Sequence, residues 1–208
     1  MKLKKIIIVV LCAFTFSCPT SCLKKGEDDP AISFRTRKNR LTGNWKIKSG
    51  TDILTGGYNP TTGNHVNKIT TIYSEDSYQR SSDEGNSTNV ISGALTYNME
   101  FKKDGEFTAT IFYENLTTNT LKGTWNFTDN IGGHNKKDQI VINFTSRSYI
   151  PAGPNSVEGG GLFGGNQSDL TYHIKELRNT KIVLVSEYSS TDNNGVTYTT
   201  SSNLTFIQ

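Results

Sequence analysis

The stretch Leu95–Tyr113 reads LTYNMEFKKDGEFTATIFY and holds two runs in which apolar residues occupy every second position. The alternating residues are Leu95, Tyr97, Met99 and Phe101 in the first run, and Phe107, Ala109, Ile111 and Tyr113 in the second. Asp104-Gly105 between the runs is a signal for a tight turn. A period of two is typical of antiparallel strands that bury one face and leave the other in water. The stretch therefore predicts a β-hairpin.

The same period recurs along most of the chain. Ile140–Phe144 and Leu170–Ile174 alternate in this way, and Asp192–Gly195 carries an Asn-Gly turn signal. We predict about nine strands, near 44–54, 66–80, 89–103, 106–114, 119–128, 138–148, 169–177, 181–189 and 196–207. Sequential strands joined by short turns favour an all-β domain, a single antiparallel up-and-down barrel of about 8–9 strands. A β-sandwich is the alternative.

The charge balance argues against a nucleic-acid partner. The 208 residues include 22 Lys and Arg and 19 Asp and Glu. Three of the basic residues, Lys2, Lys4 and Lys5, precede an apolar run at the N-terminus. Without that segment the remaining 19 basic residues balance the acidic ones, so the chain has no global attraction to nucleic acid.

The N-terminus has the proportions of a signal peptide. Met1–Lys5 is cationic, and Ile6–Phe16 is an eleven-residue apolar run. Because a helix needs about 20 apolar residues to cross a bilayer, this run is too short to span one. We predict a signal peptide over residues 1–21, which takes no part in the fold.

Small residues before a cysteine follow this run. Thr20-Ser21-Cys22 resembles the bacterial lipobox, and that resemblance implies that Cys22 becomes the mature N-terminus and carries acyl chains such as palmitate. Cys18 is the alternative, but bulky Phe16 lies two residues before it. A secreted protein with a stray cysteine is the remaining alternative.

Residues 22–34 are polar and contain Gly26 and Pro30, so we predict a flexible tether that leads into a folded domain over 35–208. No cysteine follows Cys22, and the domain therefore depends on its core and not on disulfides. The basic cluster Arg35–Arg40 predicts a solvated helical turn, with contact to phosphate or lipid head groups as the alternative.

The segment Ser148–Ser168 is rich in glycine and has no strand pattern. Long irregular segments within a compact domain are often functional or disordered. Leu162 and Phe163 are the large apolar residues of its glycine-rich part, and we consider them a possible gate over one end of the barrel. Plain disorder is the alternative.

A family resemblance comes from Arg40–Trp45, which reads RLTGNW. Gly43 and Trp45 match the Gly-x-Trp that opens the first motif of lipocalins. Together with Cys22, the tether and the strand pattern, the whole chain is similar to lipocalin-like lipoproteins of Bacteroidetes. The resemblance implies that a helical turn runs into the first strand and that Trp45 plugs one barrel end. It also implies a small apolar or amphipathic ligand inside the barrel.

The sequence carries no catalytic signature. Gly-x-Ser-x-Gly, His-Glu-x-x-His and EF-hand patterns are all absent. His65, His134 and His173 have no neighbouring residues that indicate a triad or a metal site. We therefore expect no catalytic residues, no metal and no cofactor, and we expect that the protein is not an enzyme.

Two functions remain open at this point. The first is a ligand-binding barrel held on a membrane by its lipid, in the cell envelope, as a monomeric outer-membrane lipoprotein on the periplasmic face or the cell surface. The alternative is a non-catalytic interaction module of the envelope, whose loops contact another protein or a polysaccharide. A packed barrel interior would favour the second function, and a lined interior site would favour the first.

Overall fold

A computed structural model describes residues 35–56, 68–84, 87–114, 116–128, 138–151, 169–191 and 197–208. The elements are α2 (Arg37–Leu41), β1 (Gly43–Thr55), β2 (Lys68–Ser74), β3 (Ser77–Glu84), β4 (Ser87–Phe101), β5 (Glu106–Tyr113), β6 (Thr117–Thr128), β7 (Gln139–Pro151), β8 (Asp169–Leu177), β9 (Lys181–Thr191) and β10 (Thr197–Ile207). The predicted signal peptide, the whole of the tether, Cys18, Cys22, Leu162 and Phe163 lie outside the described residues.

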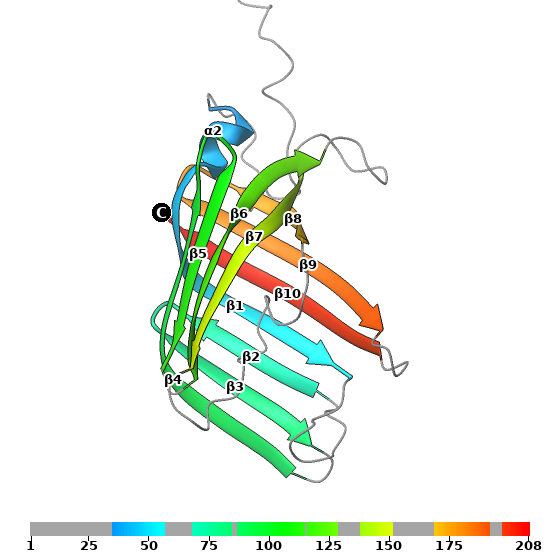
Figure 1. The fold of residues 1–208 in the computed structure, drawn as a ribbon. Helices are drawn as coiled ribbons and strands as arrows, with labels where there is room; N and C mark the ends of the chain where they lie inside the picture. The colour runs from blue at the N-terminus through cyan, green and yellow to red at the C-terminus, as the bar shows by residue number, and fades with distance from the viewer. Residues whose placement is uncertain are drawn as a thin grey trace, which may run out of the picture.

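The strands form one closed antiparallel barrel, with the order β1-β10-β9-β8-β7-β6-β5-β4-β3-β2 (Figure 1). This closure confirms the prediction of an all-β antiparallel barrel and excludes the β-sandwich. The predicted number of strands, 8–9, is wrong, because the barrel has ten. The strand predicted near 66–80 is two strands, β2 and β3, with a turn at Glu75-Asp76. That turn contains neither Gly nor Pro, the strongest turn signals in a sequence.

The barrel has different numbers of strands at its two ends. The hairpin β2–β3 pairs with β1 from Ser49 onward and with β4 up to Ala94. Beyond the hairpin, Gly43–Lys46 of β1 pairs directly with Asn98–Phe101 of β4. The end that holds α2 is therefore a ring of eight strands, and the opposite end is a ring of ten (Figure 1). We call these the eight-stranded end and the ten-stranded end.

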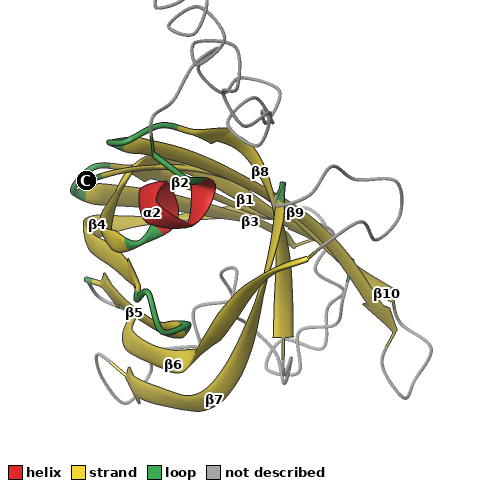
Figure 2. Ribbon diagram, turned by 90° about the horizontal axis from the view of Figure 1, so that it is seen from above, coloured by secondary structure: helices red, strands yellow, loops and turns green. Residues whose placement is uncertain are grey.

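The short helix α2 lies across the eight-stranded end (Figure 2). Thr36 begins it, because its side chain accepts a hydrogen bond from the backbone N–H of Asn39. Arg37 and Arg40 are buried, and Arg40 donates through Nη1 to the carbonyl oxygen of Leu177 on β8. The helical turn predicted from the basic cluster is present, but the expectation that it is solvated is wrong for these two arginines.

Apolar side chains fill the interior of the eight-stranded end. Phe101 contacts both Phe107 and Trp125, with ring centroids 5.1 and 5.6 Å apart. Tyr97 meets Phe206 edge to face at 5.1 Å. All five side chains are buried, which follows from the period of two seen in the sequence. The apolar core therefore closes this end of the barrel.

Candidate functional site

Five polar side chains form one row across the inner face of five neighbouring strands. The register pairs Arg80 with Thr71, Thr71 with Asp52, Asp52 with Ser202, and Ser202 with Ser186. We call these five residues, on β3, β2, β1, β10 and β9, the polar row. Apart from Arg80, which is half-buried, every member is less than a tenth exposed. Because polar side chains are mostly exposed in folded proteins, and buried ones usually have hydrogen-bond partners, we take the polar row as the candidate site.

Five buried tyrosines lie beside the polar row, toward the eight-stranded end. This tyrosine cluster consists of Tyr73, Tyr78, Tyr97, Tyr113 and Tyr172. The hydroxyl of Tyr73 donates to Asp52 Oδ2 at 2.6 Å and lies 3.1 Å from the hydroxyl of Tyr113. The rings of Tyr73 and Tyr97 meet at 6.2 Å, and those of Tyr78 and Tyr113 at 5.1 Å, both edge to face. The cluster therefore connects β1, β2, β3, β4 and β5 below the polar row.

Burial keeps these hydroxyls protonated. Burial raises the pKa of Tyr73, Tyr97 and Tyr172 well above the usual value for tyrosine, and the carboxylate of Asp52 raises each further. Burial likewise raises the pKa of Tyr113. At neutral pH the cluster is therefore a set of neutral O–H groups that donate and accept hydrogen bonds.

Two buried hydroxyls in this region have no hydrogen-bond partner within the described part of the chain. They are the hydroxyl of Tyr172, whose side chain is fully buried, and Oγ of Ser202. A buried polar group without a partner costs about 1–3 kcal/mol. Such groups in a folded protein point to a bound molecule or to water that completes their hydrogen bonds.

Arg80 is the charged member of the row that remains without a partner. Within the described residues its guanidinium forms neither a hydrogen bond nor an ion pair. Burial lowers the pKa of Arg80, while the hydroxyls of Tyr113, Tyr73 and Tyr78 act in the opposite direction. Arg80 lies two residues from Tyr78 on the inner face of β3, and its guanidinium stays charged because arginine does not lose its proton in proteins.

Apolar side chains on the same inner face lie level with Arg80 or further toward the ten-stranded end. We call Leu54, Ile69, Ile91 and Tyr188 the apolar rim, and the register places each of them on or next to a strand of the polar row. Ile91 is 39% exposed and Tyr188 is 38% exposed. Because both face inward, solvent reaches the interior at this end, above the polar row.

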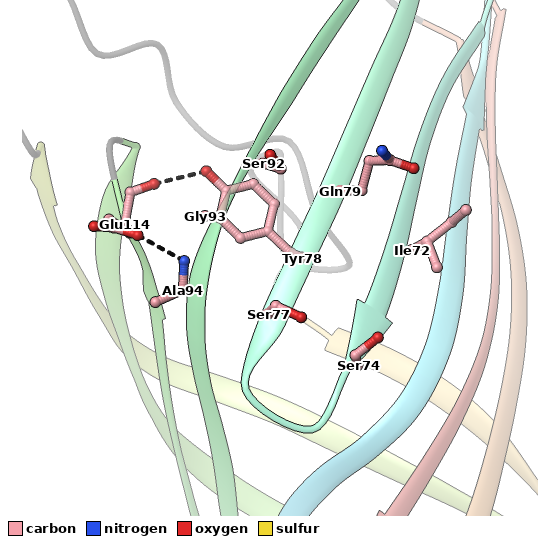
Figure 3. Close-up of a pocket in the computed structure, with 9 residues that line it drawn as sticks. All are labelled: Ile72, Ser74, Ser77, Tyr78, Gln79, Ser92, Gly93, Ala94 and Glu114. Carbon is pink, nitrogen blue, oxygen red and sulfur yellow. Dashed lines mark hydrogen bonds between the residues drawn. The ribbon is translucent and has the colours of Figure 1, made fainter.

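A hollow lies on the outside of the barrel, at the turn of the β2–β3 hairpin (Figure 3). It has a volume of about 560 Å³ and includes Ser74, Ser77 and Ser92. The carboxylate of Glu114 accepts from the N–H of Ala94 at 2.8 Å, and the carbonyl of Glu114 accepts from Tyr78 at 2.6 Å. These groups hold β3, β4 and the end of β5 together, so we assign this hollow a structural role.

Gly43 and Trp45, the residues of the predicted barrel-end motif, lie together at the eight-stranded end. Gly43 begins β1 with a φ of 135°, in the region that favours glycine. Trp45 is 1% exposed, and its Nε1 donates to the carbonyl oxygen of Leu41 at 2.7 Å. The motif is thus remote from the polar row.

The three histidines do not meet in a described site. His173 lies on β8, whereas His65 and His134 lie outside the described residues. Within the described ranges, no group of three or more His, Cys, Asp and Glu side chains could hold a metal ion. No helix of those ranges is long and apolar enough to cross a membrane.

The sequence analysis missed the polar row. One signal was present, because Ser202 is in phase with Leu204 and Phe206, which are buried on the same strand. A polar residue at a position where the alternating pattern otherwise places apolar residues predicts a polar group that faces the interior. The position of Arg80 beside Thr71 and Asp52 depends on the register between strands, which the sequence does not display.

Comparison with known proteins identifies no family for this chain. No family model matches the sequence, and no curated protein matches it. Among solved structures, the crystal structure of Rv2717c from M. tuberculosis is similar, with 13% sequence identity and a TM-score of 0.35. The match covers 79% of this chain and 91% of that chain.

Proposed function

We propose that this protein is a lipid-anchored binding protein of the cell envelope, whose barrel takes one small amphipathic ligand through its ten-stranded end. The observation that carries the proposal is the polar row, with Arg80 and the hydroxyl of Ser202 unpartnered within the described residues. The apolar core blocks the other end, so a ligand has one route in.

The order of side chains along the barrel matches a molecule with two different ends. The apolar rim would contact an apolar body, and the polar row and the tyrosine cluster would bind a polar head group. In a barrel whose interior is filled by its own side chains, burying these polar groups would cost free energy that no interaction offsets. A ligand changes that balance, because it supplies the missing hydrogen bonds. For this reason we prefer ligand binding to the alternative of an interaction module with a solid core.

The remaining parts of the proposal come from the sequence. The lipobox-like Thr20-Ser21-Cys22 supports a lipid on Cys22, and residues 22–34 would tether the barrel to the membrane. The Gly43-x-Trp45 motif and a barrel that encloses a site are in keeping with the lipocalin-like lipoproteins of Bacteroidetes. We propose a monomer in the outer membrane that has no catalytic activity.

Binding of a neutral fluorescent probe tests the proposal. N-phenyl-1-naphthylamine becomes bright in apolar surroundings, and we expect it to bind the mature protein with saturation. Ser202→Phe places a ring in the polar row and should abolish binding. Asn203→Phe adds the same ring on the exposed outer face of β10 and should leave binding intact. If the wild-type protein does not bind the probe, or if both variants bind equally, the proposed site is wrong.

A further inference from the structure

Arg80 of β3 faces the interior of the barrel, where the register places it beside Thr71. Within the described residues its guanidinium has neither an ion pair nor a hydrogen bond, although it could donate five. Taking a guanidinium even partly out of water costs free energy unless a counter-charge or hydrogen bonds compensate. A bound group of opposite charge would supply the missing partner.

Asp52 is the nearest acidic member of the polar row, and it does not fill this role. Thr71 of β2 lies between Asp52 on β1 and Arg80 on β3, so two strand spacings, roughly 10 Å, separate the two backbones. The carboxylate of Asp52 accepts instead from the hydroxyl of Tyr73 at 2.6 Å. Arg80 therefore remains available to a ligand.

Resting on the proposed function, we infer that the ligand is an amphipathic acid, whose carboxylate binds the guanidinium of Arg80 inside the ten-stranded end. Guanidinium and carboxylate match as planar forks with two parallel hydrogen bonds. The apolar rim, which includes Ile91 opposite Arg80 in the register, receives the apolar body of the acid.

The charge on Asp52 does not prevent this arrangement. Coulomb energy falls as the inverse of distance, so a carboxylate in direct contact with Arg80 is attracted by Arg80 more strongly than it is repelled by Asp52, which lies two strands away. The hydroxyl of Tyr73 donates a hydrogen bond to the carboxylate of Asp52, and this bond offsets part of the negative charge of Asp52. A neutral or cationic head group would leave Arg80 without a partner and would bind less tightly.

Matched competitors with one chain length isolate the head group. Decanoate, decanol and decylamine are titrated against the mature protein loaded with neutral N-phenyl-1-naphthylamine. We expect decanoate to displace the probe at a concentration at least about tenfold lower than decanol, as hydrogen bonds to a charged group predict. Decylamine should be the weakest competitor. Equal potency of decanoate and decanol overturns the inference.

Two variants assign the effect to Arg80. Arg80→Gln should remove the advantage of decanoate over decanol. Lys68→Gln deletes the same charge from the exposed face of the adjacent strand β2 and should preserve the advantage. An advantage that survives Arg80→Gln in folded protein overturns the assignment.

The outcomes separate this inference from the proposed function. If the probe and decanol bind but decanoate gains nothing, the binding barrel stands and the anionic ligand is wrong. If no probe binds, both fail. Should Arg80→Gln not fold, the wild-type comparison of decanoate with decanol still decides, and a salt dependence of decanoate binding alone would support the charged contact.

Discussion

Trp45 joins the helix to the first strand at the eight-stranded end. Its ring is buried, and its Nε1 donates to the carbonyl oxygen of Leu41 in a region that water does not reach. Trp45 and the core around it, far from the polar row, therefore contribute to the stability of the fold and not to the chemistry of the site.

Replacement of Trp45 by Phe tests this role. The variant keeps an aromatic ring but leaves the carbonyl of Leu41 without its donor, so we expect a loss of about 1–3 kcal/mol in the free energy of unfolding. Trp125→Phe is the control, because the bond from its Nε1 to the carbonyl of Lys102 is only partly buried. Urea unfolding should show the larger loss for Trp45→Phe, and equal losses would contradict the assignment.

Glu176 makes the stability of the fold depend on pH in the acidic range. Burial alone would raise the pKa of Glu176, but hydrogen bonds from Lys181 and Arg178 outweigh this and hold its pKa below the usual value. A carboxyl whose pKa is lower in the folded state stabilises the fold above its unfolded pKa, about 4.3. That stability is lost as the pH falls through the lower, folded value.

We therefore expect Glu176→Gln to be less stable than wild type at pH 7 and to lose less stability between about pH 5 and pH 3. Thermal unfolding across this range measures both effects. Glu187→Gln, which removes an exposed carboxyl from β9, should follow the wild-type curve. Parallel curves for wild type and Glu176→Gln would show that the ion pairs carry no net stability.

At the scale of the elements, the backbones of β6 and β7 lie close together at Gly123. A bulge at Lys122/Gly123 shifts the register of this pair. A Cβ on Gly123 would lie 2.1 Å from the backbone oxygen of Asn143. Backbone atoms cannot move easily to relieve such a clash. The glycine thus permits the strand pairing that closes this side of the barrel.

Gly123→Ala should therefore cost about 1–3 kcal/mol in the free energy of unfolding, as overpacking generally does. Gly93→Ala is the matched control within β4, where the new Cβ would meet Cβ of Glu114 at 3.1 Å on an exposed side chain. Its cost should be smaller. Similar melting temperatures for the two alanine variants would refute the argument.

The strands were largely predictable, and the site was not. Alternation identified nine strand positions because burial on one face leaves a period of two in the sequence. In β1 the pairing with β10 shifts between Ile47 and Ser49. Counting every second residue from Trp45 puts Asp52 on the outer face, and this bulge returns it to the inner one. A bulge depends on the partner strand, so the sequence alone did not reveal Asp52.

At the scale of the whole molecule, the proposed lipid anchor is separate from the fold. Cys22→Ala should release the protein from membranes into the soluble fraction and leave the melting temperature of the domain unchanged, because the folded domain over 35–208 contains no cysteine. Cys18→Ala should remain bound to membranes. Mass spectrometry of the mature N-terminus checks the site directly, and an acyl mass on Cys18 would transfer the assignment to that residue.

The pairing of Gly43–Lys46 with Asn98–Phe101 closes the barrel without any help from β2 and β3. The hairpin acts as an insert that widens one rim of an already closed ring. Its length and side chains can therefore diverge between related proteins without breaking that ring. Selection on ligand size would act on residues 68–84, while selection on folding would act on the other eight strands. Exchanging this hairpin between homologues is accordingly a direct route to barrels of new capacity.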